Sequence, residues 1–251
     1  MSVFNEEELA RYSRHIVLQD FGVEGQRRLA DSRVLIIGVG GLGSPAALYL
    51  AAVGVKEIGI VDGDVVETSN LHRQIIHTTP EIGKEKVQSA LWKMSALNPN
   101  VNVSTYHTRV DKSNISELIE PYDFVMDCTD NFTIKFLINE ACVLANKPFS
   151  HGGVSQWSGQ TMTIKPRKTA CYACVFNAPP PVEAVPTTAV VGLVGVIPGI
   201  LGTIQVAEAI KVLTGVGEPL YNSLLTFNAK DMSFRKVAVN KNSQCPVCGA
   251  T

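Results

Sequence analysis

Short apolar runs alternate with segments of helical spacing between residues 31 and 152. A continuous apolar run such as Val34–Ile37 is typical of a strand buried on both faces. Val87, Leu91 and Met94 recur with the spacing of one helical face. Because parallel neighbours require crossover helices, this alternation predicts a doubly wound, mostly parallel α/β sheet. We expect strands at Arg33–Ile37, Glu57–Val61, Val101–Tyr106, Phe124–Met126 and Pro148–His151, and helices at Pro45–Ala52, Lys84–Leu97 and Thr133–Ala145.

The pattern changes after residue 152. Three further runs predict strands without regular helices between them: Gly159–Ile164, Leu224–Phe227 and Phe234–Val239. We therefore expect this part to be antiparallel and to extend the first sheet. Residues 1–30 form a polar helical arm in this interpretation. The length suits one domain with three parts, 1–30, 31–152 and 153–251.

An uncharged stretch extends from Ala184 to Ala207, about the length of the roughly 20 apolar residues that span a bilayer. Pro186, Pro198 and several glycines interrupt it, and no long basic flank sets an orientation. We therefore favour a loop at Pro179–Thr188 and then a buried helix, and we expect no membrane association. The helix is predicted to place Ile204, Ala207, Ile210 and Leu213 on one side, Glu208 and Lys211 on the other, and to stop at Gly215.

Composition and charge argue against several classes of function. Lys and Arg total 22 against 23 for Asp and Glu, so the net charge of −1 gives no long-range attraction to nucleic acid or anionic membranes. The hydrophobic content of 45% is too high for a disordered chain. Met1–Ala10 carries Glu6–Glu8 where a signal peptide needs a basic start and an apolar run. We therefore expect a cytoplasmic protein.

A glycine-rich turn, GVGGLG, follows the first predicted strand at residues 38–43. Gly38, Gly40, Gly41 and Gly43 fit the G-x-G-x-x-G pattern, in which backbone N–H groups and a helix N-terminus bind phosphate. Asp62 ends the second predicted strand, 19 residues after the last glycine, where an acid can bind ribose hydroxyls. Together these features predict a Rossmann-like, nucleotide-binding half. The alternative is a tight turn that needs glycine only for its dihedral angles.

The chain after the glycine-rich turn carries more cations than a hydride-transfer enzyme requires. Arg73 and Lys86 would neutralise the charge that builds up on a pyrophosphate leaving group. Asp130 follows a buried strand at the edge of the sheet where ligands bind, so it is a candidate magnesium ligand. Asp127 and Asp130 could instead cap the helix that begins near Thr133. The polar residues of these two regions are Asp64, Ser69, Asn70, Arg73, Gln74, Lys84, Lys86, Asp130 and Asn131.

The six cysteines fall into two groups. Two C-x-x-C pairs supply the four thiolates of a tetrahedral structural zinc site: Cys171, Cys174, Cys245 and Cys248. In a reducing compartment such pairs bind zinc more often than they form disulfides. We expect the zinc ion to fasten the C-terminal segment to the region after Ile164 and to do no chemistry. Cys128 and Cys142 lie in apolar surroundings and are expected in the core.

The chain resembles the bacterial MoeB and ThiF adenylyltransferases, relatives of the ubiquitin-activating enzymes, over essentially its whole length. The resemblance rests on the glycine turn, both cysteine pairs and these stretches: Arg11-Tyr12-Ser13-Arg14, Asp62-Gly63-Asp64, Ser69-Asn70-Leu71-His72-Arg73-Gln74, Lys86 and Asp127-Cys128-Thr129-Asp130-Asn131. It implies one adenylation domain that takes a small ubiquitin-like sulfur-carrier protein ending in Gly-Gly. With Mg-ATP, its terminal carboxylate becomes an acyl-adenylate and pyrophosphate is released. A separate sulfur donor protein then converts the adenylate to a thiocarboxylate.

The resemblance also implies roles for individual residues. Asp62 would hold the ribose and Asp130 the magnesium ion. The phosphates would be contacted by Asn70, Arg73 and Lys86. Arg14 would reach into the ATP site of a partner subunit, which makes the enzyme a homodimer and adds Arg14 to the catalytic candidates Arg73, Lys86 and Asp130. Without the resemblance, the sequence predicts only that Arg14 lies on the solvated face of a helix.

The chain departs from the family in the loop after the first cysteine pair. Family members usually carry a cysteine there, and some use it to bind the carrier or sulfur covalently. In this chain the loop is Phe176–Ala189, and it has no cysteine near Val185–Thr187. We therefore predict no thioester and no persulfide on this loop. His72 stands where glutamine is frequent, and no sulfurtransferase domain is expected after the second pair.

Other functions compete with this interpretation. An NAD-dependent oxidoreductase would use the glycine turn and Asp62 but leaves Arg73, Lys86 and Asp130 without a role. A scaffold that retains only the fold would have lost an ATP-binding cation, and none is lost. A related enzyme adenylates a nucleoside in tRNA, but this chain has no basic extension to hold RNA. The carriers of thiamine and molybdopterin biosynthesis fit equally well, so the pathway stays open.

Overall fold

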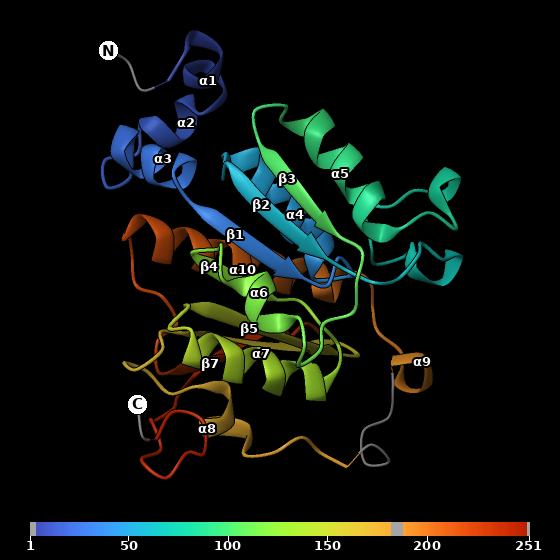
Figure 1. Cartoon of the computed structure of the whole chain (residues 1–251), viewed down its shortest axis with the longest axis vertical. Helices are drawn as coiled ribbons and strands as arrows, with labels where there is room; N and C mark the ends of the chain where they lie inside the picture. Colours follow the sequence, from blue (N-terminus) through green and yellow to red (C-terminus); the bar gives the residue numbers. More distant parts are fainter. Residues whose placement is uncertain (1–3, 182–187, 250–251) are drawn as a thin grey trace.

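A single eight-stranded sheet forms the centre of the computed structural model, which describes residues 4–181 and 188–249 (Figure 1). The strand order is β3-β2-β1-β4-β5-β6-β7-β8. The strands are β1 (Arg33–Ile37), β2 (Glu57–Val61), β3 (Asn102–Tyr106), β4 (Phe124–Asp127), β5 (Phe149–Ser155), β6 (Ser158–Ile164), β7 (Ser223–Asn228) and β8 (Ser233–Ala238). The α-helices are α1 (Glu6–Arg11), α2 (Ser13–Ile16), α3 (Gly22–Ala30), α4 (Gly43–Val53), α5 (Lys86–Leu97), α6 (Ile115–Ile119), α7 (Phe132–Leu144), α8 (Tyr172–Phe176), α9 (Thr188–Val191) and α10 (Val196–Thr214), and two short 3₁₀ helices are η1 (Thr68–Asn70) and η2 (Thr79–Glu81).

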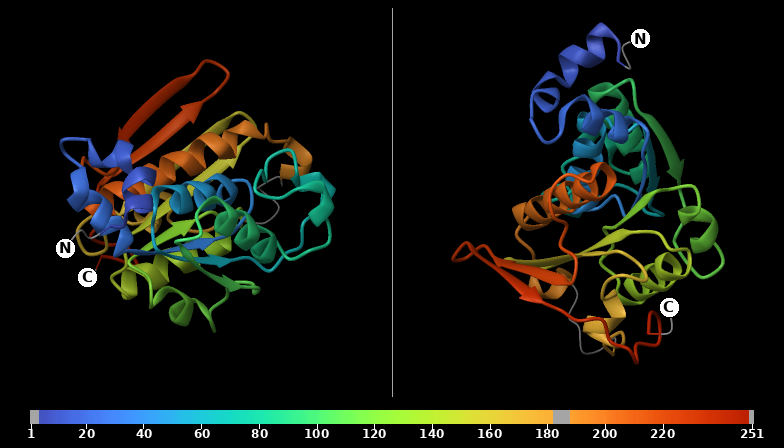
Figure 2. Two further views of the ribbon diagram at one scale, coloured as in Figure 1. Left: turned by 90° about the horizontal axis from the view of Figure 1, so that it is seen from above. Right: turned by 90° about the vertical axis from the view of Figure 1, so that its left-hand side faces the viewer.

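The sheet has a parallel half and an antiparallel half, as the sequence predicts. Strands β1 to β5 pair in parallel. The chain places β2 and β3 on one side of β1 and then β4 and β5 on its other side, so the strand order reverses between β1 and β4. Strands β5 to β8 pair antiparallel with their sequence neighbours. The hairpin of β7 and β8 extends beyond the helices that cover the sheet (Figure 2). Because β5 belongs to both halves, one sheet joins the regions 31–152 and 153–251; their division as parts of one domain stays a prediction.

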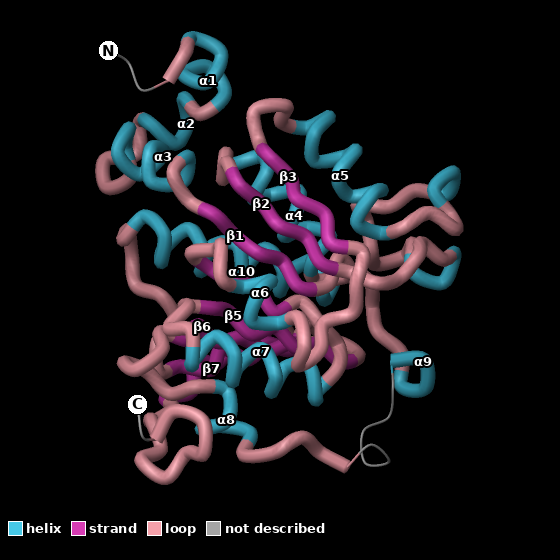
Figure 3. Tube along the Cα trace, in the orientation of Figure 1, coloured by secondary structure: helices cyan, strands magenta, loops and turns pink. Residues whose placement is uncertain are grey.

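Alternate residues of each buried strand pack against opposite layers of helices. Val34 and Ile36 of β1 pack on the side of α4, α5 and α10, whereas Leu35 and Ile37 pack on the side of α6 and α7. Both sides of β1, β2 and β4 are therefore buried, which explains their apolar runs, whereas the edge strand β3 is largely exposed. The tube drawing shows the strands between these helical layers (Figure 3).

Three predicted boundaries are wrong by more than one residue, and the first is the start of α4, which begins at Gly43 and not at Pro45. Helix α5 begins at Lys86 and not at Lys84, because Gly83 and Lys84 form backbone hydrogen bonds with Val66 that hold this segment extended. Strand β5 continues to Ser155, well past the predicted end at His151, because its whole length pairs with β6. The extra residues carry the strand to the edge of the sheet where the parallel strands end.

Helix α10 is long and apolar enough to cross a membrane by length and composition, with a mean hydropathy of 1.5. It packs on α4, β5 and β6 inside the fold, as the sequence predicts. The predicted assignment of its faces is wrong, however. Glu208 lies on the buried side at 2% exposure, while Ala207 is exposed. The buried carboxylate accepts hydrogen bonds at Oε2 from Thr163 Oγ1 and Leu220 N, both at 2.6 Å, and its other oxygen forms an ion pair with Lys211 one turn further along the helix.

The helices α1 to α3 form an arm beside the amino ends of the strands, at the upper left of Figure 1. Tyr12 anchors this arm, because its ring is buried and its hydroxyl accepts a hydrogen bond of 2.9 Å from Asn98 Nδ2. Arg11 donates a hydrogen bond of 3.0 Å to Leu97 O at the end of α5. The arm is thus fastened to the helical layer by residues of the R-Y-S-R stretch.

Candidate functional site

A cleft of about 1340 Å³ opens at the carboxyl ends of the parallel strands. Its position is that of ligand sites in doubly wound sheets, where the strand order reverses. Ten of the thirteen residues predicted to bind the nucleotide line it: Gly38, Gly40, Gly41, Asp62, Asp64, Arg73, Gln74, Lys86, Asp130 and Asn131. The other three, Gly43, Ser69 and Asn70, do not line it.

The glycine turn lies between β1 and α4, and its glycines have different roles. Gly38 has a φ of 93°, and a Cβ there would lie 2.9 Å from Cys128 O. A Cβ on Gly43 would overlap the carbonyl oxygen of Gly38. Gly43 therefore serves the close packing of the turn rather than ligand contact. Gly40 and Gly41 both line the cleft; a Cβ on Gly41 would lie 2.9 Å from Pro198 Cγ, whereas one on Gly40 would make only an ordinary contact with Gln74.

Asp62 fixes the turn from the neighbouring strand. Its Oδ2 accepts a hydrogen bond from Val39 N and its Oδ1 accepts one from Asp64 N, both at 2.9 Å. A carboxylate has about four acceptor positions, so two remain for hydroxyl groups of a ligand. Asp62 is partly buried in the wall of the cleft, where ribose hydroxyls can reach it.

Lys86 and Arg109 share Asp64 as a partner. Lys86 Nζ lies 3.2 Å from Asp64 Oδ2, and Arg109 Nη2 lies 3.1 Å from Asp64 Oδ1. The Lys86 side chain is 7% exposed, whereas that of Arg109 is 84% exposed. Lys86 is thus held at the first position of α5 with its ammonium group in the cleft. Arg109 follows β3 and was missed by the sequence analysis, because no spacing rule joins it to Asp64.

Arg73 is positioned by its own neighbours. Its Nη1 donates a hydrogen bond of 3.0 Å to Ser69 O and lies 2.8 Å from His72 Nε2. Asn70 is buried, and its Nδ2 donates to Ser69 Oγ at 3.3 Å. Ser69 and Asn70 therefore build the segment around η1 that presents Arg73 to the cleft. The phosphate contact that the family resemblance implies for Asn70 stays a prediction.

Asp127 ends β4 and Asp130 lies three residues later, and the two acids have different surroundings. Asp130 is exposed at the cleft and makes no hydrogen bond or ion pair with any described residue. Asn131 caps α7, because its Oδ1 accepts a hydrogen bond of 3.1 Å from Ile134 N. The alternative in which Asp127 or Asp130 caps this helix is therefore wrong. The Asp130 carboxylate is free to bind a divalent cation together with phosphate oxygens.

Asp127 instead lies in a buried cluster with Lys135 and His151. Lys135 Nζ is 3.0 Å and 3.2 Å from the two carboxylate oxygens, and His151 Nδ1 is 3.1 Å from Oδ2. Burial alone would raise the pKa of Asp127, but Lys135, His151 and Thr129 outweigh it and lower the pKa to about 2. Burial and the charge of Lys135 lower the pKa of His151 to about 4. The sequence analysis missed Lys135 and His151, which come from α7 and β5.

A second buried histidine supports the glycine turn. His77 Nε2 lies 3.1 Å from Val39 O, and Nδ1 lies 2.8 Å from Ser89 Oγ. A carbonyl oxygen only accepts, so Nε2 carries the proton that fixes this part of the turn. Ser89 Oγ also lies 3.0 Å from Glu81 Oε2, so its single proton serves either Nδ1 of His77 or Glu81, and Glu81 also pairs with Lys93 at 2.7 Å. No sequence signal identifies His77, since its role depends on contacts between distant residues.

Arg14 lies on α2, in the arm at the amino ends of the strands, whereas the cleft is at their carboxyl ends (Figure 1). Its side chain is exposed and makes no hydrogen bond or ion pair with the described residues. The structure therefore does not bring Arg14 together with Arg73, Lys86 and Asp130 within one chain.

The four cysteines of the C-x-x-C pairs meet in space. Their sulfur atoms lie within 4.8 Å of one another, and three of the separations are 3.3, 3.6 and 3.9 Å. These separations exceed a disulfide bond of about 2.05 Å. They approach the edge of about 3.8 Å expected for sulfur atoms that surround zinc tetrahedrally at about 2.3 Å. The donor set therefore fits a structural zinc ion. Cys128 and Cys142 are buried in the core, as predicted.

Fold and site together define an α/β nucleotide-binding protein with a phosphate turn, clustered cations and a free carboxylate at the reversal point of the sheet. The chain belongs to the ThiF family, whose model matches residues 12–247. This confirms the family resemblance.

Named relatives match nearly the whole chain. The sulfur carrier protein adenylyltransferase of Thermus thermophilus is 44% identical over 98% of this chain and 93% of its own length. The SAMP-activating enzyme E1 of Haloferax volcanii is 46% identical over 96% of this chain and 89% of its own. A crystal structure of E. coli MccB with AMPCPP and MccA superposes with a TM-score of 0.87, at 24% identity, over 98% of this chain and 75% of the other. That likeness confirms the fold.

Proposed function

We propose that this protein is an ATP-dependent adenylyltransferase, which activates the C-terminal Gly-Gly carboxylate of a small ubiquitin-like sulfur-carrier protein as an acyl-adenylate. The names of the two relatives support this proposal. The observation that carries it is the content of the cleft. A phosphate turn, the cations Arg73 and Lys86 and the free carboxylate of Asp130 all face one space. An oxidoreductase has no use for this combination.

The order of strands across the sheet supports a placement of the two substrates. Asp62 lies at the end of β2, so the ribose belongs on that side of the reversal point. The triphosphate belongs above the turn, between Arg73 and Lys86. On the other side the cleft continues over β6, β7 and β8, where its wall is polar and includes Gln160, Thr226 and Arg235. This extension offers room for the carrier tail.

The chemistry that follows is an in-line displacement. A carrier carboxylate oxygen attacks the α-phosphorus of ATP, the new O–P bond forms, and the bond between the α-phosphorus and the bridging oxygen breaks. Arg73 and Lys86 stabilise the negative charge that develops on the leaving pyrophosphate. Lys86 is prepared for this role, because phosphate oxygens can replace Asp64 as its partner while Arg109 still neutralises that acid. Magnesium, held by Asp130 and the phosphates, would supply further charge neutralisation.

We propose a homodimer in which Arg14 acts in the partner's cleft. The arm exposes Val17 at 70%, Leu18 at 50% and Val23 at 47%, and the segment before α5 exposes Ile75 at 61%. Two apolar surfaces of this kind suit a two-fold contact between copies. Mixing Arg14→Ala with Arg73→Ala protein should restore about a quarter of wild-type exchange, because half of the dimers regain one intact site. Absence of any recovery would contradict the shared site.

We further propose one bound zinc ion per chain and a cytoplasmic location. The cysteine geometry supports the zinc ion, and the absence of disulfides among the described cysteines suits a reducing compartment. The sulfur is expected from a separate protein. The loop position near Val185–Thr187, where we predict no covalent intermediate, lies outside the described residues.

ATP–pyrophosphate exchange with magnesium tests the function directly. We expect exchange with one intact Gly-Gly carrier and none with the same carrier lacking its last glycine. Lys86→Met should lower the rate by about 10²- to 10³-fold. Lys84→Met is the matched control, because Lys84 is exposed and does not line the cleft. Thermal stabilisation by NADH but not by Mg-ATP, without exchange on any carrier, would instead support the oxidoreductase.

A further inference from the structure

Two buried polar atoms of residues that line the cleft have no hydrogen-bond partner among the described residues: Gln74 Oε1, beside the glycine turn, and Nε2 of His151. The side chain of His151 is 1% exposed. A buried polar atom without a partner costs about 1–3 kcal/mol, so its retention calls for an explanation. The adenylyl transfer described above does not use Nε2 of His151.

The proton position on His151 follows from its neighbours. Asp127 is ionised, and its oxygens only accept, so Nδ1 of His151 must donate to Oδ2 at 3.1 Å. The charge of Lys135, which also donates to Gly152 O at 2.6 Å, opposes a second proton on the ring. Nε2 therefore carries a lone pair and can accept one hydrogen bond.

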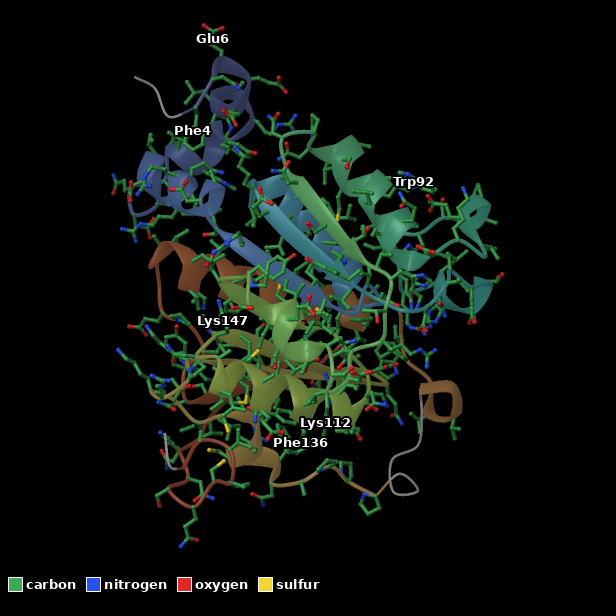
Figure 4. All side chains as sticks on the ribbon, viewed as in Figure 1. Phe4, Glu6, Trp92, Lys112, Phe136 and Lys147 are labelled. Atoms are coloured by element: carbon green, nitrogen blue, oxygen red, sulfur yellow. The ribbon has the colours of Figure 1, made fainter. Side chains whose placement is uncertain are left out.

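The ring is also fixed in direction. It packs against Tyr172 with 4.5 Å between ring centroids and faces Phe176 at 6.0 Å. Phe136 of α7 closes the other side of Tyr172 at 4.9 Å and lies beneath α7 in Figure 4. Gly153, two positions further along β5, carries no side chain beside Nε2; a Cβ there would lie 3.4 Å from this atom. The glycine leaves that side of the ring to the cleft.

The place of His151 in the sheet indicates which ligand supplies the donor. His151 is on β5, and β4 separates it from the glycine turn that follows β1. With the ribose at Asp62, as proposed above, the nucleoside would lie on the far side of that turn, and its hydroxyl and amino groups would be distant from His151. The extension of the cleft over β6, β7 and β8, proposed above for the carrier tail, begins beside β5. The only hydrogen-bond donors in a Gly-Gly tail are its backbone N–H groups.

We propose that Nε2 of His151 accepts a hydrogen bond from the N–H of the last peptide bond of the acyl donor and so orients the terminal carboxylate toward the α-phosphate. The assignment rests on the proposed function, since it presupposes a peptide carboxylate as substrate. It makes His151 a substrate-binding residue and Asp127 and Lys135 positioning residues behind it. The protein then recognises the tail at the peptide N–H nearest to the terminal carboxylate.

Three variants separate this contact from the support of the fold. His151→Asn retains an amide donor toward Asp127 and lacks an acceptor at the position of Nε2. His151→Gln places an amide group near the position of Nε2 and should recover part of the activity. Gly199→Ala, in α10 with open space around it, is the unrelated control. All should be compared by melting temperature before kinetics, so that loss of folding is recognised.

The decisive measurement pairs these variants with an altered substrate. A semisynthetic carrier whose last amide is replaced by an ester, with glycolate in place of the last glycine, lacks the N–H but keeps its shape. For the wild-type protein we expect about a tenfold rise in the KM for this carrier and no change in the KM for ATP. His151→Asn should show the raised KM with both carriers, and the ester should cost it nothing further.

The outcomes distinguish the two proposals. Suppose that the wild-type protein catalyses exchange, but that the ester raises the KM of His151→Asn as much as it raises the KM of the wild type. That result would refute the role of His151 and leave the proposed adenylyltransferase function intact. A change in the KM for ATP alone would refute it as well. Wild-type protein inactive on every amide carrier would refute the proposed function and this assignment together. An ester one linkage earlier in the tail should affect wild type and His151→Asn equally.

Discussion

Replacing Lys135 by methionine should destabilise the protein and weaken the dependence of its stability on pH. Lys135 is 4% exposed and is the charged partner of Asp127, which is itself 2% exposed. Methionine fills a similar volume without the charge. In the variant, the buried carboxylate keeps only Thr129 and His151 as partners, and the positive charge that opposes protonation of His151 is gone.

The magnitude follows from the buried pair. Removing one partner of a buried ion pair costs about 3–5 kcal/mol in the free energy of unfolding. The pKa of Asp127 points in the same direction, because Lys135, His151 and Thr129 lower it against the effect of burial. We therefore expect Lys135→Met to be destabilised by about 3 kcal/mol or more at pH 8.

The two proteins should differ in how strongly stability depends on pH. In the wild type, the pKa of His151 is lowered to about 4, so unfolding takes up a proton below the unfolded value of 6.5 and stability falls as the pH drops. In Lys135→Met, burial still lowers the pKa of His151, but the charge of Lys135 no longer does and Asp127 still raises it, so the folded pKa is higher than in the wild type. The fall in stability toward low pH is therefore smaller in the variant.

Urea unfolding at pH 6 and pH 8 measures both effects, with Lys135→Arg as the control that keeps the charge. We expect the difference in stability between the wild type and Lys135→Met to be smaller at pH 6 than at pH 8. A loss below about 1 kcal/mol, or an equal loss at both pH values, would refute the description of the cluster as a charged unit.

Further predictions concern the turn and the cysteine cluster. Gly43→Ala should cost about 3 kcal/mol or more, because its Cβ meets the Gly38 carbonyl, whereas Gly199→Ala in α10 should be neutral or stabilising by about 0.5–1 kcal/mol; urea unfolding compares them. Cys245→Ser should abolish one bound zinc per chain in metal analysis and lower the melting temperature, while Cys142→Ala should retain the metal. Asp62→Asn should weaken ATP binding in calorimetry, because an amide presents N–H where Val39 N and Asp64 N need acceptors.

The parallel half of the fold could be predicted because its signals are local. Apolar runs, the glycine turn and the cysteine spacing each lie within a few neighbouring residues. The reversal at β1 and β4 follows once the crossovers are assumed. The faces of α10 could not be predicted in the same way. Burial of Glu208 depends on Thr163 and Leu220, which approach it only in the folded chain.

The candidate site also contains residues that belong to short sequence motifs and residues that only the fold brings together. Arg73, Lys86 and Asp130 belong to short motifs, and the structure brings them to one cleft. His151 and Lys135 have no motif of their own, because the sheet and α7 bring them to Asp127 across separations of 24 and 8 residues. Residues that act through a buried neighbour are therefore the ones that sequence spacing misses.

The cysteine cluster also has a consequence for chain entropy. A metal that joins Cys171 to Cys245, 74 positions later, turns the intervening chain into a closed ring that contains α10, β7 and β8. Closing a ring of this size lowers the conformational entropy of the unfolded chain, which raises its free energy by roughly 4 kcal/mol. Within the ring, α10 cannot detach and diffuse away with a free end. The antiparallel half should therefore unfold as one unit while the metal is bound, and piece by piece after it is removed.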